Sequence, residues 1–291
     1  MRPANFDSYW DNVDAELEAF PARPVLEELP MRSNEHCTVY ALRLTSIGPY
    51  RIFGYLSVPR GAGPFPALLQ TPRYGSVNHI PDYNDRLRYV CLQIMHRGQR
   101  LADQPYSASY PGLLTDGIVD QDGYIYRGIV ADCMRAAEYL LGRDDVDQER
   151  VAIQGDDLAL ITAARRTGFA LVNASGLMFY RLAEARLETS SYPAEEINEF
   201  CRAFPDNQDD AEETLALFDP QYHVGGLQSP VLLAIGGDRD WFQPLLDQLG
   251  DNCQIYELTH RGGTDHDNID RLIAERLETP PMSRFIRTLS H

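Results

Sequence analysis

Five short apolar runs alternate with helix-like segments along the chain, and this alternation constrains the fold more than any other feature. The runs cover residues 67–70, 90–94, 151–153, 169–172 and 230–235. Each run is almost continuously apolar, which is typical of a parallel strand that is buried on both faces. Helical spacing of apolar residues favours helices at 127–141 and 158–166. The sequence therefore predicts an α/β fold, with a mostly parallel central sheet and helices on both faces.

The two ends of the chain extend this pattern. An amphipathic helix is predicted at 5–20, and alternating residues predict antiparallel strands at 39–44 and 50–58. Together they form an N-terminal helical and hairpin extension over about residues 1–60. Near the other end we expect a strand at 253–258.

Two further regions complete the prediction. Residues 182–218 are expected to form an acidic helical excursion, and a final helix is expected at 268–277. No internal repeat or low-complexity linker divides the sequence, so residues 1–291 are interpreted as one domain.

Charge excludes two classes of partner. The formal net charge is −17, and all 26 basic residues are arginine. Nucleic acids and anionic membrane surfaces attract clustered positive charge, so neither is an expected partner. No apolar run is long enough to span a bilayer, and no signal peptide is visible. Five scattered cysteines without C-x-x-C spacing are typical of free thiols in a reducing compartment, so we expect a cytoplasmic protein.

The segment Gly155-Asp156-Asp157-Leu158-Ala159 lies between a predicted strand and a predicted helix. This is the strand–turn–helix context of the G-x-S-x-G nucleophile elbow. Asp157 occupies the serine position, and Ala159 replaces the last glycine. Because a carboxylate and an alcohol perform different chemistry, this position limits what can be expected of the function. The histidines lack the spaced partners of a zinc site, and there is no glycine-rich phosphate loop, so neither a metal nor a cofactor is predicted.

Several motifs resemble one family when they are taken in order along the chain. They are Phe6-Asp7-x-x-Trp10, the hairpin Arg51 to Pro59, Arg97-Gly98-Gln99, Gly117-Ile118-x-Asp120, Tyr124-x-Tyr126-Arg127, Asp132-x-x-Arg135-Ala136-x-Glu138, and Phe218-Asp219 before Pro230-Val231-Leu232. Each motif is weak alone, but the series is similar to carbohydrate esterase family 7, the acetyl xylan esterases and cephalosporin C deacetylases. The resemblance implies an α/β-hydrolase fold, hydrolysis of acetyl groups from small sugars and related esters, and a homo-oligomer, often a hexameric ring.

The resemblance also implies a catalytic triad with Asp157 at the nucleophile position. The family's D-x-x-x-P pattern places the acid at Asp240, with Asp238 as the alternative. The family's H-E-G-G pattern places the histidine at His260, with His266 as the alternative.

The family's H-G-Y-G loop, which supplies an oxyanion donor, aligns with Pro72-Arg73-Tyr74-Gly75. The implied donors are the backbone N–H groups of Tyr74 and Leu158. Arg73 is a candidate for substrate binding, or for an ion pair that fills the pocket beside Asp157.

Three functions remain open for a carboxylate at this position. Asp157 is a covalent nucleophile in the first, as in the haloalkane dehalogenase and epoxide hydrolase branches of the fold. In the second, Asp157 or His260 is a general base and the chain is a hydrolase of small acetylated esters. In the third, the family's ester hydrolysis is lost, and the chain is a pseudoenzyme that binds a small ligand or a partner.

Overall fold

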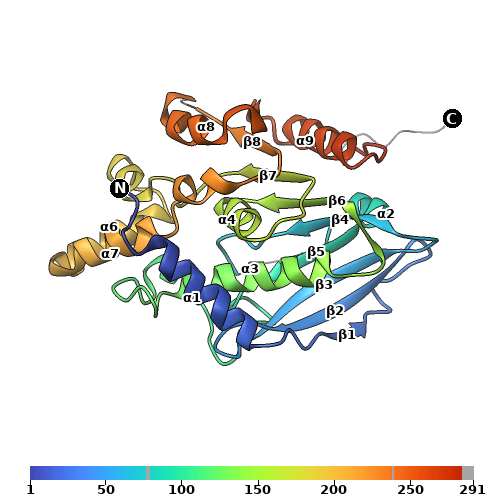
Figure 1. The fold of residues 1–291 in the computed structure, drawn as a ribbon, viewed down its shortest axis with the longest axis horizontal. Helices are drawn as coiled ribbons and strands as arrows, with labels where there is room; N and C mark the ends of the chain where they lie inside the picture. The colour runs from blue at the N-terminus through green and yellow to red at the C-terminus, as the bar shows by residue number, and fades with distance from the viewer. Residues whose placement is uncertain (77–78, 238, 284–291) are drawn as a thin grey trace.

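The computed structural model describes residues 1–76, 79–237 and 239–283, and a twisted nine-stranded sheet runs through it (Figure 1). The strand order is β1-β2-β3-β5-β4-β6-β7-β8-β9. The first three strands and the β3–β5 pair are antiparallel, and the strands from β5 to β9 are parallel neighbours. The predicted α/β class and mostly parallel sheet are confirmed. The strands are β1 (Val25–Glu28), β2 (Cys37–Thr45), β3 (Arg51–Pro59), β4 (Phe65–Gln70), β5 (Val90–Met95), β6 (Val146–Gly155), β7 (Leu171–Ser175), β8 (Val231–Ile235) and β9 (Cys253–Glu257).

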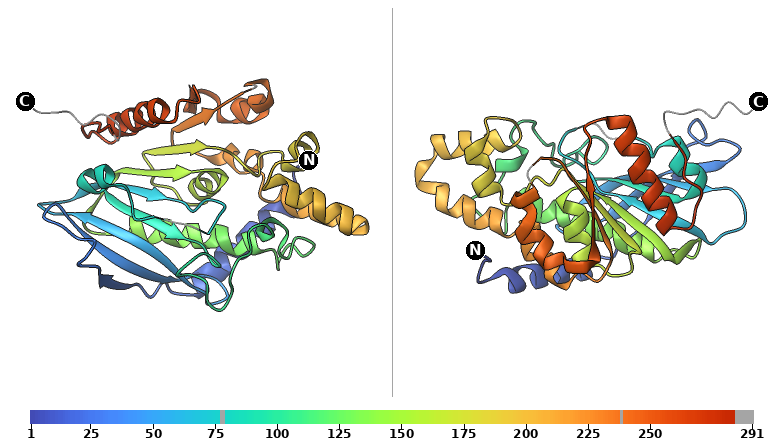
Figure 2. Two further views of the ribbon diagram at one scale, coloured as in Figure 1. Left: turned by 180° about the vertical axis from the view of Figure 1, so that it is seen from behind. Right: turned by 90° about the horizontal axis from the view of Figure 1, so that it is seen from above.

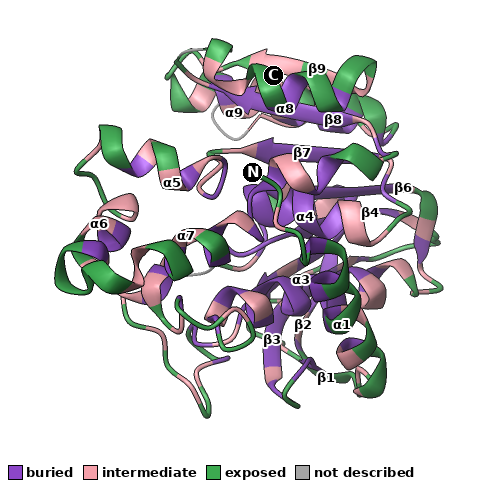
Figure 3. Cartoon of the chain, turned by 60° about the vertical axis from the view of Figure 1, so that its left-hand side comes forward, coloured by how far each residue is buried: buried purple, intermediate pink, exposed green. Residues whose placement is uncertain are grey.

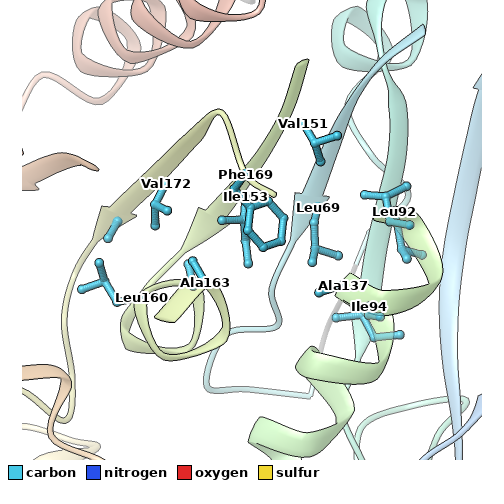
Figure 4. Packing of buried hydrophobic residues seen from close by; sticks show 14 of the residues in the cluster. Leu69, Leu92, Ile94, Ala137, Val151, Ile153, Leu160, Ala163, Phe169 and Val172 are labelled. Atoms are coloured by element: carbon cyan, nitrogen blue, oxygen red, sulfur yellow. The ribbon is translucent and has the colours of Figure 1, made fainter. Parts of the chain in front are cut away.

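One face of the sheet carries the largest apolar core. Helices α3 (Ile125–Leu141), α4 (Asp157–Arg165) and α8 (Gln243–Leu249) pack there against alternate strand residues. Figure 4 shows Leu69, Leu92 and Ile153 from three adjacent strands facing Ala137 and Ala163 of the two longer helices. The other face of the sheet is covered as well, so these strands are buried on both faces. This explains why their sequences are nearly continuous apolar runs.

The opposite face is covered by α9 (Gly262–Arg276) and the short helix α2 (Tyr83–Arg88). The views in Figure 2 show α9 lying along the sheet, apart from α8. Helix α9 begins six residues before the predicted start at 268. The glycines at its start disfavour a helix locally, but Asp265 in the first turn accepts hydrogen bonds from Thr259 N (3.0 Å), Thr259 Oγ1 (2.8 Å) and Tyr256 Oη (2.9 Å) and anchors it.

The N-terminal residues form α1 at Phe6–Ala19 and the predicted antiparallel pair of β2 and β3, to which β1 adds a third strand that was not predicted. Trp10 of α1 is fully buried, and its indole N–H donates to Leu217 O at 3.2 Å. Its ring meets those of Phe218 and His223 edge to face, at centroid distances of 5.4 and 5.1 Å. The opening motif therefore packs the first helix against the segment that leads to β8.

The predicted excursion at 182–218 contains α5 (Leu182–Ala185), α6 (Ala194–Ala203) and α7 (Gln208–Ala216). Figure 3 shows these helices projecting beyond the sheet, with exposed outer sides and buried inner sides. Glu196 of α6 is buried, and it accepts hydrogen bonds from Leu114 N at 2.9 Å and from the Tyr74 hydroxyl. The excursion is thus tied to the loop that follows β4. Within the described ranges, no helix has the length and apolar content that crossing a membrane requires.

Candidate functional site

The turn between β6 and α4 consists of a single residue. Strand β6 ends at Gly155, Asp156 is the N-cap, and α4 begins at Asp157. Asp156 has φ −108° and ψ −143°, and neither aspartate is among the described non-glycine residues with positive φ. The strained turn that lifts a nucleophile out of the sheet in a hydrolase elbow is therefore not formed.

Gly155 is required by a close approach at this turn. A Cβ atom at this position would lie 1.8 Å from Oγ1 of Thr71, which is a buried residue directly after β4. Two neighbouring parallel strands thus end in contact with one another, and only glycine fits between them.

The Asp157 carboxylate points into the protein rather than into solvent. The side chain is fully buried, and it accepts backbone N–H groups from three successive residues of the segment after β7. Oδ2 accepts from Met178 and, at 3.0 Å, from Phe179, and Oδ1 accepts from Tyr180 at 3.1 Å. Both oxygens are therefore engaged in holding this segment against the start of α4.

The neighbouring Asp156 carboxylate is also buried, and it caps the helix. Its Oδ1 accepts the N–H of Leu158 at 3.0 Å, which satisfies one of the free donors at the helix start. Burial raises the pKa of Asp156 to about 6, although the Leu158 N–H and the Arg73 guanidinium act in the opposite direction.

Asp157 shares this buried position with Asp156. Burial raises the pKa of Asp157 well above its usual range, and the adjacent Asp156 carboxylate raises it further. The N–H groups of Phe179 and Met178 favour the ionised form and oppose this shift. Because two adjacent buried carboxylates repel one another, the pair binds protons more readily than surface aspartates do.

The loop after β4 contains two of the predicted site residues. Gln99 of the R-G-Q motif is fully buried, and its side-chain amide donates to Arg73 O at 2.9 Å and Gly75 O at 2.7 Å. Tyr74 is half-buried, and its ring packs edge to face on Tyr110. The Gln99 amide thus fixes the backbone of the loop, and the Tyr74–Tyr110 ring contact fixes one of its side chains.

Arg73 is exposed and forms no ion pair with any residue in the described part of the chain. The expected ion pair between Arg73 and Asp157 is therefore wrong, because the Asp157 carboxylate is turned away and bonded to backbone. Arg73 acts on this site through its charge, which lowers the pKa of Asp156.

The predicted acid and base lie at the ends of the last two strands. Asp240 belongs to an exposed single turn, Arg239–Phe242, and Asp238 lies outside the described residues. His260 is exposed in the loop after β9, with φ 59°, and its imidazole has no hydrogen bond or ion pair with a described residue. His266 is in the first turns of α9, where its Nδ1 lies 3.7 Å from Oδ1 of Asp267.

Asp157 and Leu158 are the first two residues of α4 and therefore lie together. In contrast, His260 forms no hydrogen bond with Asp240 or with Asp157. The sequence reasoning missed the role of Asp156. A capping aspartate directly before a helix is a recognisable signal, and it predicts that one N–H group of the first turn is already used. No group of three histidine, cysteine or acidic side chains in the described ranges is placed to hold a metal ion.

Comparison with known proteins gives matches at three levels. The model of the family described as acetyl xylan esterase (AXE1) matches residues 1–247. The acetyl esterase Axe7A of Xylanibacter ruminicola is 26% identical over 182 residues, which is 55% of this chain and 40% of that protein. The match thus covers less than half of that relative's length.

Two solved structures have the same fold over nearly the whole chain. The acetyl xylan esterase from Paenibacillus sp. R4 has a TM-score of 0.81 at 22% identity, covering 94% of this chain and 95% of that one. Acetyl xylan esterase 1 from Thermoanaerobacterium sp. JW/SL YS485 has a TM-score of 0.76 at 20% identity, covering 94% of each. At these identities the likeness establishes the α/β-hydrolase fold.

Proposed function

The chain belongs to the acetyl xylan esterase family, and we propose that it is a member in which ligand binding has replaced ester hydrolysis. The observation that carries the proposal is the use of Asp157. A nucleophile must present a lone pair to the substrate, whereas both oxygens of this carboxylate accept backbone N–H groups and the side chain is fully buried.

The surroundings of Asp157 also disfavour ester hydrolysis. If the Asp157 carboxylate were ionised and turned toward a bound ester, at about 4 Å from the developing oxyanion it would repel that oxyanion by about 4 kcal/mol at an effective dielectric constant of about 20. That is a rate loss of about three orders of magnitude. The N–H of Leu158, the implied oxyanion donor, is already bonded to Asp156. A missing oxyanion donor costs a further factor of about 10² to 10³.

The two active alternatives lack support from the contacts. Attack by Asp157 on a saturated carbon, as in a dehalogenase, needs a carboxylate oxygen that a substrate can reach, and this side chain is fully buried. Activation of water by His260 needs an oriented imidazole, and this one is exposed without a partner among the described residues. An active hydrolase of small acetylated esters is therefore the alternative that an assay must exclude. The homo-oligomer and the cytoplasmic location remain predictions.

Hydrolysis of p-nitrophenyl acetate by the full chain tests the proposal, with an active family esterase as the positive control. We expect wild-type turnover at the rate of buffer. We also expect Asp157→Ser to be no faster than Asp157→Ala, because the side chain at this position is buried and points into the protein. Asp157→Ala is the matched control, since both variants lose the carboxylate and only the serine variant gains an alcohol. Wild-type turnover well above buffer that is lost in Asp157→Ala would refute the proposal. A Ser variant tenfold or more faster than the Ala variant would show that the position still faces a substrate.

A further inference from the structure

A cavity of about 660 Å³ lies between the sheet and helices α2 and α9, at the carboxyl ends of the parallel strands. Its volume is within the range of small-molecule sites. Its floor consists of residues from β4 to β7, and its walls come from the loop after β4, from α2 and from α9. Arg73, Tyr74, Gly155 and His266 also line it, so a ligand of the candidate site would occupy this space.

Two buried amides on the floor of the cavity have no partner within the described part of the chain. Gln93, Gln70, Gln154 and Asn173 are successive register partners on β5, β4, β6 and β7, so their amides form a row on one face. Gln93 and Gln154 are half-buried, but Gln70 is only 8% exposed and Asn173 only 7%.

These two side chains are where a bound molecule is missing most clearly. The Oδ1 atom of Asn173 is buried without a hydrogen-bond partner, and the Gln70 side chain has no partner among the described residues. Buried amides are normally hydrogen-bonded. The pair therefore indicates a ligand that offers both hydrogen-bond donors and acceptors to the floor of the cavity.

A positive charge lies on the loop after β4. Arg73 lines the cavity and forms no ion pair with a described residue. Burial raises the pKa of the nearby Asp156 and the Arg73 charge opposes this shift, but Oδ1 of Asp156 is bonded to the Leu158 N–H at 3.0 Å. The Gln99 amide holds the backbone of Arg73 by its carbonyl oxygen at 2.9 Å. The guanidinium N–H groups therefore remain available, and their preferred partner is a carboxylate.

A surplus of negative charge lies on the wall that α2 and α9 form. Asp85 of α2 and Asp270 of α9 both line the cavity, and they share the guanidinium of Arg88 at 3.0 and 2.5 Å. All three side chains are buried. Asp82, the N-cap residue of α2, adds a third carboxylate to the lining. One shared guanidinium does not balance these carboxylates, so this acidic wall (Asp82, Asp85 and Asp270) attracts a cationic group.

We propose that the cavity binds a short peptide with free ends. Its carboxylate pairs with Arg73, its ammonium faces the acidic wall, and its peptide groups bond to the amides of the floor. A simple anion would meet the acidic wall, a simple cation would meet Arg73, and a neutral molecule would use neither charge. Each peptide group supplies one N–H donor and one carbonyl acceptor, as the amides require. This inference rests on the binding role proposed above and names the ligand class of that site.

Isothermal titration calorimetry of the full chain tests the inference with L-alanyl-L-alanine and tri-L-alanine as probes. The titrations are made at pH 7, where an ordinary terminal amine is mostly charged and an ordinary histidine mostly neutral. We expect at least one peptide to bind at one site per chain with a Kd below about 10 mM. The N-acetyl form and the C-terminal amide of that peptide should each bind about tenfold or more weakly, because each lacks one of the two charges.

Two variants identify the residues that recognise the peptide. Arg73→Gln should weaken binding of the free peptide about tenfold but leave the affinity of its C-terminal amide unchanged, because that form has no carboxylate to lose. Arg100→Gln is the matched control, since Arg100 is exposed and does not line the cavity. Asn173→Leu should weaken both forms. Its control is Gln254→Met, in the same register row on β9 but outside the cavity.

Three results would overturn the inference. They are the failure of both peptides to bind, equal affinity for the free and the capped peptides, and equal binding of the free peptide by the wild type and Arg73→Gln. The ester assay decides the proposed function separately. Turnover by the wild type would refute that function even if peptides bind, whereas absence of both turnover and peptide binding would overturn only the ligand class.

Discussion

Replacement of Asp157 by alanine distinguishes a structural carboxylate from a catalytic one. In this structure the side chain is fully buried and accepts the N–H groups of Met178, Phe179 and Tyr180. Phe179 and Tyr180 are themselves buried, so alanine would leave at least two N–H groups without a partner or access to water. A buried donor left unsatisfied costs about 1–3 kcal/mol.

The expected net effect is smaller than the sum of these losses. Removal of the carboxylate also relieves its burial and its repulsion by Asp156, which together raise its pKa. We therefore expect Asp157→Ala to lower the free energy of unfolding by about 2–4 kcal/mol, at the upper end of ordinary point mutations. Asp157→Asn keeps one acceptor oxygen and should lose less.

Urea unfolding followed by circular dichroism measures this difference, provided that the m-value is unchanged between variants. Residues held in place for catalysis are commonly destabilising, so their replacement leaves stability unchanged or raises it. An alanine variant as stable as the wild type, or more stable, would therefore refute the structural interpretation of Asp157 and return it to the list of catalytic candidates.

Two further predictions concern the same turn. The pKa of Asp156 is about 6, against an ordinary value of 3.8, so between these pH values the folded protein holds a proton that the unfolded chain has released. Its contribution to stability is thus present below about pH 4 and lost as the pH rises to about 6, by about 3 kcal/mol. Asp156→Asn keeps the cap without this titration, so urea midpoints should show the variant gaining on the wild type between pH 4 and pH 7; a constant difference would contradict the shift. Gly155→Ala should lower stability by about 1–3 kcal/mol because its Cβ would overlap Thr71 Oγ1 at 1.8 Å. Thermal melting of Gly155→Ala with and without Thr71→Ala checks this, since the double variant should recover part of the loss, and no recovery would assign the cost to another contact.

The sequence alone determined the architecture of this protein. The apolar run at 230–235 became β8 (Val231–Ile235), and the helix predicted at 127–141 became α3 (Ile125–Leu141). Such elements are predictable because strand and helix periodicities are local, and burial on both faces of a sheet leaves a continuous apolar run. The boundaries were less accurate, as at α9, where a contact from Asp265 to Thr259 extends the helix through two glycines.

Only the tertiary structure decided how the polar side chains are used. The sequence places Asp157 at the nucleophile position, but its direction is set by Met178 to Tyr180, about twenty residues further on. Likewise Gln70, Gln93 and Gln154 are each a single polar residue in a strand, and they form a row only because the strand order places β5, β4 and β6 side by side. A side chain's partners depend on which distant segments the fold brings beside it, and local pattern carries no information about that choice.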